Sequence, residues 1–140
     1  MRHCVIPPFI MERLARSADP EIRRRALANI ALAATLRARR GLAQAAPGTP
    51  PATTSPAGGR HRLVYDAGRE DRLPGRLVRA EGQGPGRDPA VNEAYDHSGT
   101  TFDFFSGVFG RNSLDDRGMT LVSSVHMAEA GGVPMSNAFW

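Results

Sequence analysis

The sequence predicts an α+β fold, with a mostly antiparallel sheet and one long helix, on three observations. Residues 61–67 and 76–80 have the polarity pattern of strands, and a Pro-Gly turn at residues 74 and 75 separates them. Residues 88–110 carry the periodicity and the terminal signals of a helix. The run from residue 119 to residue 126 then alternates like a half-buried strand. Strands followed by a helix and a further strand favour the α+β class.

The predicted long helix has a clear start and a clear end. Asp88 can cap the free N–H groups of its first turn, and Pro89 follows at a position where a missing N–H costs nothing. Gly110 supplies the stop. Its apolar residues recur at spacings of three, four or seven, so they should form one stripe that packs against the sheet. They are Val91, Tyr95, Phe102, Phe105 and Phe109.

The first part of the chain predicts an extended arm and a short helix. Residues 3–11 contain Pro7 and Pro8, which fix φ and push their predecessors into extended geometry. Residues 11–18 are expected to form the short helix, with Leu14 packing inward.

A longer helix follows. Asp19 and Pro20 open it in the same way as residues 88 and 89, and Gly41 is expected to end it. Its expected apolar face consists of Ile22, Ala26, Ile30 and Ala33, with Leu27 and Leu36 alongside. One helix and an arm cannot close a core alone, so this segment must lie on another part of the protein.

A linker joins the two parts. Residues 44–59 hold no charged and no large apolar side chain, and they are rich in Pro, Ala, Thr, Ser and Gly. The segment is a passive tether, a site of proteolytic processing, or both. We therefore divide the chain into residues 1–43, a linker at 44–60, and residues 61–140.

The charges are unevenly distributed. All 18 basic residues are arginines. Residues 1–59 hold nine of them and three acidic residues, which gives this part a net charge of +6. Residues 60–140 hold nine arginines and eleven acidic residues, a net charge of −2. A solvated arginine-rich helix explains the front half better than nucleic-acid binding, because Phe9 is its one aromatic residue. We expect neither a nucleic-acid nor a membrane partner.

Five motifs carry a resemblance to a known family. They are VNEAYD (91–96), FDFF (102–105), FGRNS (109–113), SSVH (123–126) and NAFW (137–140). In this order they resemble the N-terminal domain of thermolysin-like neutral zinc metallopeptidases. Residues 3–13 (HCVIPPFIMER), followed by an arginine-rich helix, are similar to the short propeptide of the protealysin-like branch. Precursors of that branch commonly lack a standard signal peptide, and residues 5–11 are too short and proline-broken to be one.

The resemblance implies peptide-bond hydrolysis, with protein and peptide substrates. The family's zinc ion is held by two histidines of a His-Glu-x-x-His helix and by a distant glutamate. The four histidines here stand at positions 3, 61, 97 and 126, and none has a second histidine four residues on. We therefore expect no zinc ligand and no catalytic residue in this chain, and no activity of the chain alone. Calcium is also bound in the family, but Asp115 and Asp116 are better explained as a polar turn.

The resemblance also implies a substrate-binding edge strand formed by Asn137, Ala138, Phe139 and Trp140. A substrate would lie antiparallel to it and bond to its backbone and to the asparagine amide. The alternative is that the two aromatic residues belong to a core. The connection at residues 127–136 is longer than the family pattern, and Met127 stands where an aromatic residue is expected.

The proline-containing arm is the second candidate site. Pro7 and Pro8 resist cleavage, so the arm could block the catalytic domain of its own chain, as the resemblance implies for a propeptide. Cys4 could in principle bind the zinc ion as a thiolate, but a small buried hydrophobic residue is the preferred interpretation; as the one cysteine it forms no internal disulfide.

The leading prediction is the N-terminal fragment of a secreted-type zinc metalloendopeptidase precursor, extracellular by family. A non-enzymatic inhibitor or chaperone of a related protease is the alternative. A basic nucleic-acid-binding protein is a weaker one.

Overall fold

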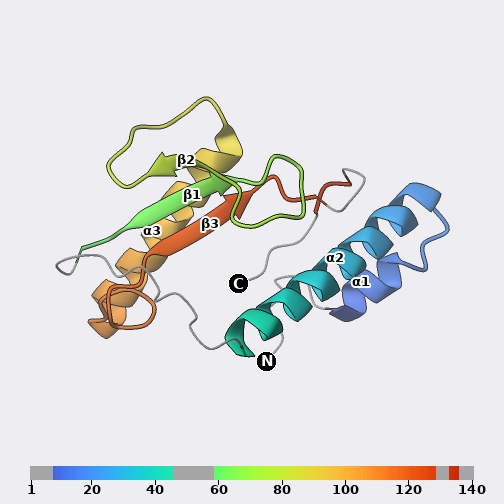
Figure 1. Cartoon of the computed structure of the whole chain (residues 1–140), viewed down its shortest axis with the longest axis horizontal. Coiled ribbons are helices and arrows are strands. Elements are labelled where there is room, and N and C mark those ends of the chain that lie inside the picture. Colours follow the sequence, from blue (N-terminus) through green and yellow to red (C-terminus); the bar gives the residue numbers. More distant parts are fainter. Residues whose placement is uncertain (1–7, 46–58, 129–132, 136–140) are drawn as a thin grey trace. The chain divides into compact units, whose positions relative to one another are not determined.

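The computed structural model describes residues 8–45, 59–128 and 133–135 (Figure 1). Its elements are α1 (Pro8–Leu14), α2 (Pro20–Ala45), β1 (Arg62–Asp66), β2 (Arg76–Ala80), α3 (Pro89–Phe109) and β3 (Leu121–Val125). They fall into two compact units, one made of residues 1–49, 69–71 and 126–140 and the other of residues 50–68 and 72–125. Among the described helices, none is both long and apolar enough to cross a membrane.

The second unit contains a three-stranded sheet in the order β2-β1-β3. β1 pairs antiparallel with β2, with a register shift between Val64 and Tyr65. It pairs parallel with β3, from Arg62 opposite Leu121 to Asp66 opposite Val125. The α+β class is thus confirmed, although the sheet is mixed rather than mostly antiparallel. The reason is that α3 returns the chain to the end where β1 starts, so that β3 leaves from that end (Figure 1).

α3 covers one face of this sheet, and the core lies between the two (Figure 1). Val64, Val91 and Tyr95 are buried there, with Val78, Ala94 and Val125 packed against them. The stripe predicted on α3 is buried only at its start, since Phe102 and Phe105 are half-buried and Phe109 is 59% exposed. A helix of 21 residues is about 32 Å long, whereas a strand of five residues spans about 17 Å. The sheet is therefore too short to cover the whole stripe.

Both predicted ends of α3 are confirmed. The Asp88 carboxylate accepts a hydrogen bond from the Ala90 amide at 3.0 Å, from an extended backbone conformation. Gly110 ends the helix in the left-handed region at φ 64°, and its N–H bonds to the carbonyl of Ser106. These local contacts fix where α3 begins and ends.

The predicted boundaries of the front helices are wrong by a few residues. α1 starts at Pro8 instead of residue 11, because proline suits the first position of a helix. Met11 is the buried residue of α1, whereas Leu14 is 40% exposed. α2 continues through Gly41 to Ala45 instead of ending at the glycine. A glycine inside a helix costs about 1 kcal/mol and does not by itself end the helix.

The buried face of α2 is only partly the expected one: Ala26, Ala33 and Leu36 are buried as predicted, and Ile30 is half-buried. Ile22 and Leu27 are 43% and 53% exposed. The residues that α2 buries are mostly small: Ala26, Ala28, Asn29, Leu32, Ala33 and Leu36. The start of the helix is as predicted, since the Asp19 carboxylate accepts the amide of Glu21 at 2.8 Å. Most of the predicted linker, residues 46–58, lies outside the described residues.

Candidate functional site

Most of the predicted site residues lie outside the described part of the chain. This holds for the proposed substrate edge of Asn137, Ala138, Phe139 and Trp140, and for Cys4 and Pro7 of the arm. Pro8 is described and is the first residue of α1. The roles assigned to these residues from the sequence therefore stay predictions.

The structure describes residues 126–128 and 133–135 of the segment before residue 137, and residues 126 and 128 bond to the loop between β1 and β2. The chain turns after β3 at His126, whose φ is 54°. The Arg69 amide donates to the carbonyl of His126 at 2.9 Å, and the Ala128 amide donates to that of Glu70 at 3.2 Å. Ala128 is completely buried.

The longer connection at residues 127–136 begins and ends as an antiparallel pair. Ala128 forms a bridge with Pro134, and the Met135 amide donates to the carbonyl of Met127 at 2.9 Å. Residues 127–128 and 133–135 therefore run antiparallel to each other.

The same loop, residues 69–71, is also bound by α2. The Arg39 guanidinium donates to the backbone carbonyl of Asp71 at 2.8 Å and to its carboxylate at 2.9 Å. The two side chains are 51% and 33% exposed. This contact between residues 32 positions apart had no signal in the sequence.

The described residues do not fit a metal site. Among them, no three His, Cys, Asp or Glu side chains lie close enough together to hold an ion. Asp115 accepts the amides of Arg117 at 2.9 Å and Met119 at 3.0 Å, and the bond from Arg117 is the main reason that its pKa is lowered. Asp116 accepts the amide of Asn112 at 2.9 Å. Both carboxylates thus stabilise the polar turn that the sequence predicts.

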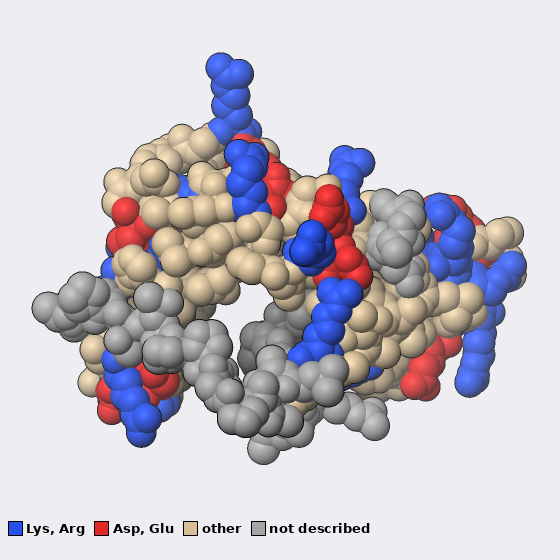
Figure 2. Space-filling model, viewed as in Figure 1, with Lys and Arg blue, Asp and Glu red and all other residues tan. Residues whose placement is uncertain are grey.

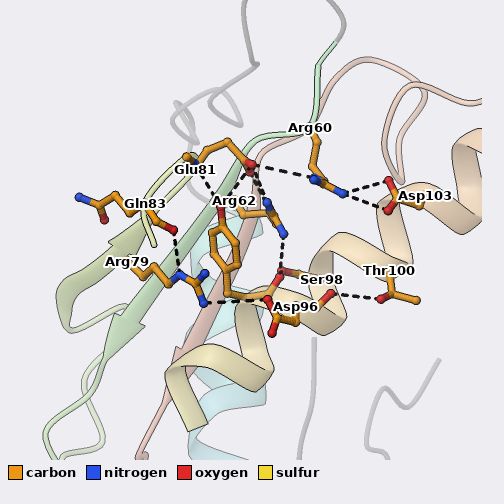
Figure 3. A network of polar contacts seen from close by, with 11 residues as sticks. Arg60, Arg62, Arg79, Glu81, Gln83, Asp96, Ser98, Thr100 and Asp103 are labelled. Atoms are coloured by element: carbon orange, nitrogen blue, oxygen red, sulfur yellow. Dashed lines mark hydrogen bonds and ion pairs between the residues drawn. The ribbon is translucent and has the colours of Figure 1, made fainter. Parts of the chain in front are cut away.

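A buried polar network lies where α3 meets the start of β1 (Figure 3). Arg62 is only 7% exposed in its side chain and forms two hydrogen bonds to Glu81, at 2.6 and 2.7 Å. It also donates to the carbonyl of Tyr95 at 3.1 Å. The bonds with Arg62 are the main reason that the pKa of Glu81 is lowered, and the same contact raises the pKa of Arg62.

Two arginines sandwich the ring of Tyr95. The guanidinium carbons of Arg62 and Arg79 each lie 3.6 Å from its centroid. They must occupy opposite faces, because one face has no room for two guanidiniums at that distance. Arg79 is held in place by Asn92 at 3.1 Å and by the carbonyl of Gln83 at 3.3 Å. Cation–π contacts of desolvated arginines are worth up to about 2 kcal/mol each.

The outer part of this network is exposed. Arg60 donates to both carboxylate oxygens of Asp103, at 3.0 and 3.1 Å, and lies 3.9 Å from Glu81 (Figure 3). The network thus joins β1, the turn after β2 and α3. Because its buried charges are paired, we interpret it as structural rather than catalytic.

This network could have been predicted from the sequence by asking which charged residue shares the core face of β1. Arg62 and Val64 are two residues apart, so their side chains share one face of β1. An arginine on the core face requires an acidic partner, and Glu81 directly follows β2. Tyr95, with its polar hydroxyl, was the residue of the helix stripe suited to meet them.

Arginines and carboxylates are interspersed on the face of the molecule shown in Figure 2. Among the described residues, Arg24, Arg39 and Arg60 each have a carboxylate within 4.0 Å. This pattern gives no support to the nucleic-acid alternative, which needs arginines clustered as an uncompensated patch.

Comparisons with known proteins agree with the resemblance of the motifs. The family model described as thermolysin metallopeptidase, catalytic domain, matches residues 59–140. An extracellular metalloprotease of Pectobacterium carotovorum is 40% identical over 136 residues, which are 97% of this chain and 37% of the relative. Protease PrtS of Photorhabdus is 48% identical over 80 residues, which are 57% of this chain and 20% of that protein.

A solved structure extends this similarity to the fold. The precursor of protealysin, a metalloproteinase from Serratia proteamaculans, matches with a TM-score of 0.73 and 36% identity. The match covers 98% of this chain and 35% of the precursor. The chain thus spans little more than a third of the length of these two relatives.

Proposed function

Because this chain belongs to the thermolysin family of metallopeptidases, we propose that it supplies the propeptide and the front of the catalytic domain of a zinc metalloendopeptidase precursor. Residues 1–43 are the propeptide, residues 44–60 the linker, and residues 61–140 the catalytic part. The observation that carries the proposal is the 40% identity over 136 residues, because a match of that length includes both parts. The protein is proposed to act outside the cell, in keeping with the name of that relative.

We further propose that these 140 residues do not hydrolyse peptides by themselves. When bound, the zinc ion of the family polarises a water molecule for attack on the peptide carbonyl. The residues described here do not form a site for it. Their proposed contribution is to bind and orient the substrate.

The proposed substrate-binding edge consists of Asn137, Ala138, Phe139 and Trp140. A peptide would add to it as a further strand, through backbone hydrogen bonds and the asparagine amide. The antiparallel bridge between the buried Ala128 and Pro134 supports this proposal, because it holds residues 133–135, which shortly precede the proposed edge in the sequence.

The proposed role of the arm is inhibition of the catalytic domain of its own chain. Pro8 fixes the first turn of α1, and we propose that Pro7 and Cys4 extend from it. For Cys4 we propose a small buried hydrophobic residue, and a thiolate ligand of the zinc ion in the full-length protein is the alternative.

The substrate edge can be tested by fluorescence, because Trp140 is the one tryptophan of the sequence. Titration with a blocked apolar tetrapeptide should give a saturable change in tryptophan emission. Asn137→Ala should raise the dissociation constant about 2- to 10-fold, the effect of one or two lost hydrogen bonds. Phe104→Ala changes an exposed aromatic residue of α3 and serves as the control. Absence of a saturable change would reject the edge.

The division of the chain has a separate test at the level of the gene. If the reading frame continues beyond the codon for Trp140, it should encode a His-Glu-x-x-His helix. Unrelated sequence at that place would contradict the proposed precursor. Zinc binding by equilibrium dialysis and peptide cleavage by the purified 140-residue chain should both be absent; cleavage would contradict the proposed inactivity.

A further inference from the structure

Arg39 joins two segments to which we assign different roles. It lies on α2, in the proposed propeptide, whereas Asp71 lies between β1 and β2, within the part matched by the thermolysin family model. One guanidinium binds both the backbone carbonyl of Asp71, at 2.8 Å, and its carboxylate, at 2.9 Å. Two bonds from one planar group fix the direction of approach as well as the distance.

The loop that Arg39 binds is itself well anchored. The Arg69 amide and the Glu70 carbonyl both bond to the backbone at residues 126–128, at 2.9 and 3.2 Å. Ala128 is completely buried beside this pairing. The backbone next to Asp71 is therefore held by two hydrogen bonds of its own, which makes Asp71 a firm attachment point for a side chain from α2.

We propose that Arg39 and Asp71 form a latch that keeps the helical segment, residues 8–45, bound to the loop at residues 69–71 after the connecting segment 46–58 has been cut. The inference rests on the proposed assignment of residues 1–43 as a propeptide, and it names the contact that retains this propeptide. A cut chain has lost its covalent tether, so retention then depends on contacts of this kind.

The chemistry of the latch determines how it responds to its surroundings. A lysine ammonium is a point charge and cannot reproduce the fork of a guanidinium that binds two oxygens at once. Because Arg39 and Asp71 are 51% and 33% exposed, salt should screen their attraction. Release of the helical segment is thus expected to become easier as ionic strength rises.

The test uses the full chain with the recognition sequence of a site-specific protease placed within residues 46–58. After cutting, the fraction of helical fragment that stays with the rest of the chain is measured by size-exclusion chromatography at several protein concentrations. Arg39→Ala should raise the dissociation constant of the fragment about 2- to 5-fold, the range expected for an exposed ion pair. Arg39→Lys should fall between the wild type and Arg39→Ala.

Two control variants remove a charge at a neighbouring place without removing the latch. Arg24→Ala breaks the Arg24–Glu21 pair within α2, whose members are 60% and 59% exposed. Glu70→Gln changes the residue next to Asp71 and leaves its backbone carbonyl in place. Both should retain the fragment as the wild type does. In the double variant Arg39→Ala with Asp71→Ala, the second change should add little to the first.

High salt provides an independent readout. In 1 M NaCl the difference between the wild type and Arg39→Ala should largely disappear, since charges are then screened within about 3 Å. The latch is wrong if Arg39→Ala behaves like Arg24→Ala, or if the wild-type fragment is lost at every concentration. The retention measurement involves neither peptide binding nor hydrolysis. Its result can therefore be interpreted even if the peptide-binding test or the gene test of the proposed function fails.

Discussion

The sheet-and-helix region, residues 60–125, and the helical segment, residues 8–45, use arginine in opposite ways. In the first, the side chains of Arg62 and Arg79 are only 7% and 8% exposed and enclose Tyr95. In the second, Arg24 and Arg39 are 60% and 51% exposed, and each pairs with one carboxylate. Buried arginines specify how elements pack, whereas exposed ones contribute contacts that can be broken without unfolding.

The two regions also differ in the size of the apolar side chains that they bury. The sheet-and-helix region buries Val64, Val91 and Tyr95 in one cluster. Among the α2 residues whose burial the structure describes, Leu32 and Leu36 are the large apolar ones that are buried, and most of the other buried residues are alanines. Burial of a large apolar side chain is worth about 1.5–3 kcal/mol, and an alanine contributes much less. We therefore expect the sheet-and-helix region to unfold cooperatively, and the helical segment to unfold in a separate and weaker transition.

The largest effect is expected from Arg62→Met. The change leaves the Glu81 carboxylate without its main partner. It also removes one of the two guanidiniums that stack on the ring of Tyr95. Breaking a buried pair typically costs 3–5 kcal/mol, and we expect about 3 kcal/mol because Glu81 is 26% exposed. Urea denaturation of the sheet-and-helix region should report this loss. Arg24→Met, on the exposed pair of α2, should leave the stability nearly unchanged. Equal effects of the two changes would abolish the distinction between the regions.

The sequence predicted the elements of the sheet-and-helix region better than those of the helical segment, for a physical reason. Asp88, Pro89 and Gly110 act within one turn of the residues that they cap, so α3 could be placed to the residue. Pro8 and Gly41 are ambiguous, because proline suits both an extended arm and a helix start, and a helix tolerates an interior glycine.

Contacts between distant residues account for most of what was missed. The direction of β3, parallel to β1, depends on the path of α3, and the Arg39–Asp71 contact joins residues 32 positions apart. Neither feature produces a pattern among neighbouring residues of the sequence. The family, by contrast, was predicted correctly from five short motifs, since their order along the chain is itself information. The predicted substrate edge of Asn137 to Trp140 remains untested by the described residues.

Two glycines of α3 offer the next comparison. A Cβ on Gly99 would lie 2.5 Å from the guanidinium of Arg62, whereas a Cβ on Gly107 would meet nothing within 4 Å. Alanine normally stabilises a helix by about 1 kcal/mol relative to glycine. Gly107→Ala should therefore raise the free energy of unfolding by about 0.5–1 kcal/mol. Gly99→Ala should lower it by about 1–2 kcal/mol, because Arg62 cannot move without losing its bonds to Glu81. If both changes stabilise, Arg62 is less firmly held than its contacts indicate.

Equivalent caps in the two regions test whether they unfold together. Asp19 caps α2 and Asp88 caps α3, each by accepting a backbone amide two residues on, at 2.8 and 3.0 Å. Replacement of either by alanine should cost about 1 kcal/mol. We expect Asp88→Ala to shift the main unfolding transition, followed by the fluorescence of the two tyrosines, 65 and 95. Asp19→Ala should shift only a helix transition, followed by circular dichroism. One common shift for both variants would show a single cooperative unit.

The smallest effect is the pH dependence contributed by Glu81. Hydrogen bonds from Arg62 lower the pKa of this carboxyl group in the folded protein, so the folded state binds its proton less readily than the unfolded state. The resulting stabilisation is complete above the pKa of an unfolded glutamate, about 4.3, and is lost as the pH falls through the lowered folded pKa. Glu81→Gln removes this group while Asp115, whose pKa is also lowered, remains. The difference in unfolding free energy between wild type and Glu81→Gln should therefore shrink below pH 4. A constant difference from pH 7 to pH 3 would mean that the charge of Glu81 does not stabilise the buried network, and the contrast with the exposed pairs of α2 would then rest on packing alone.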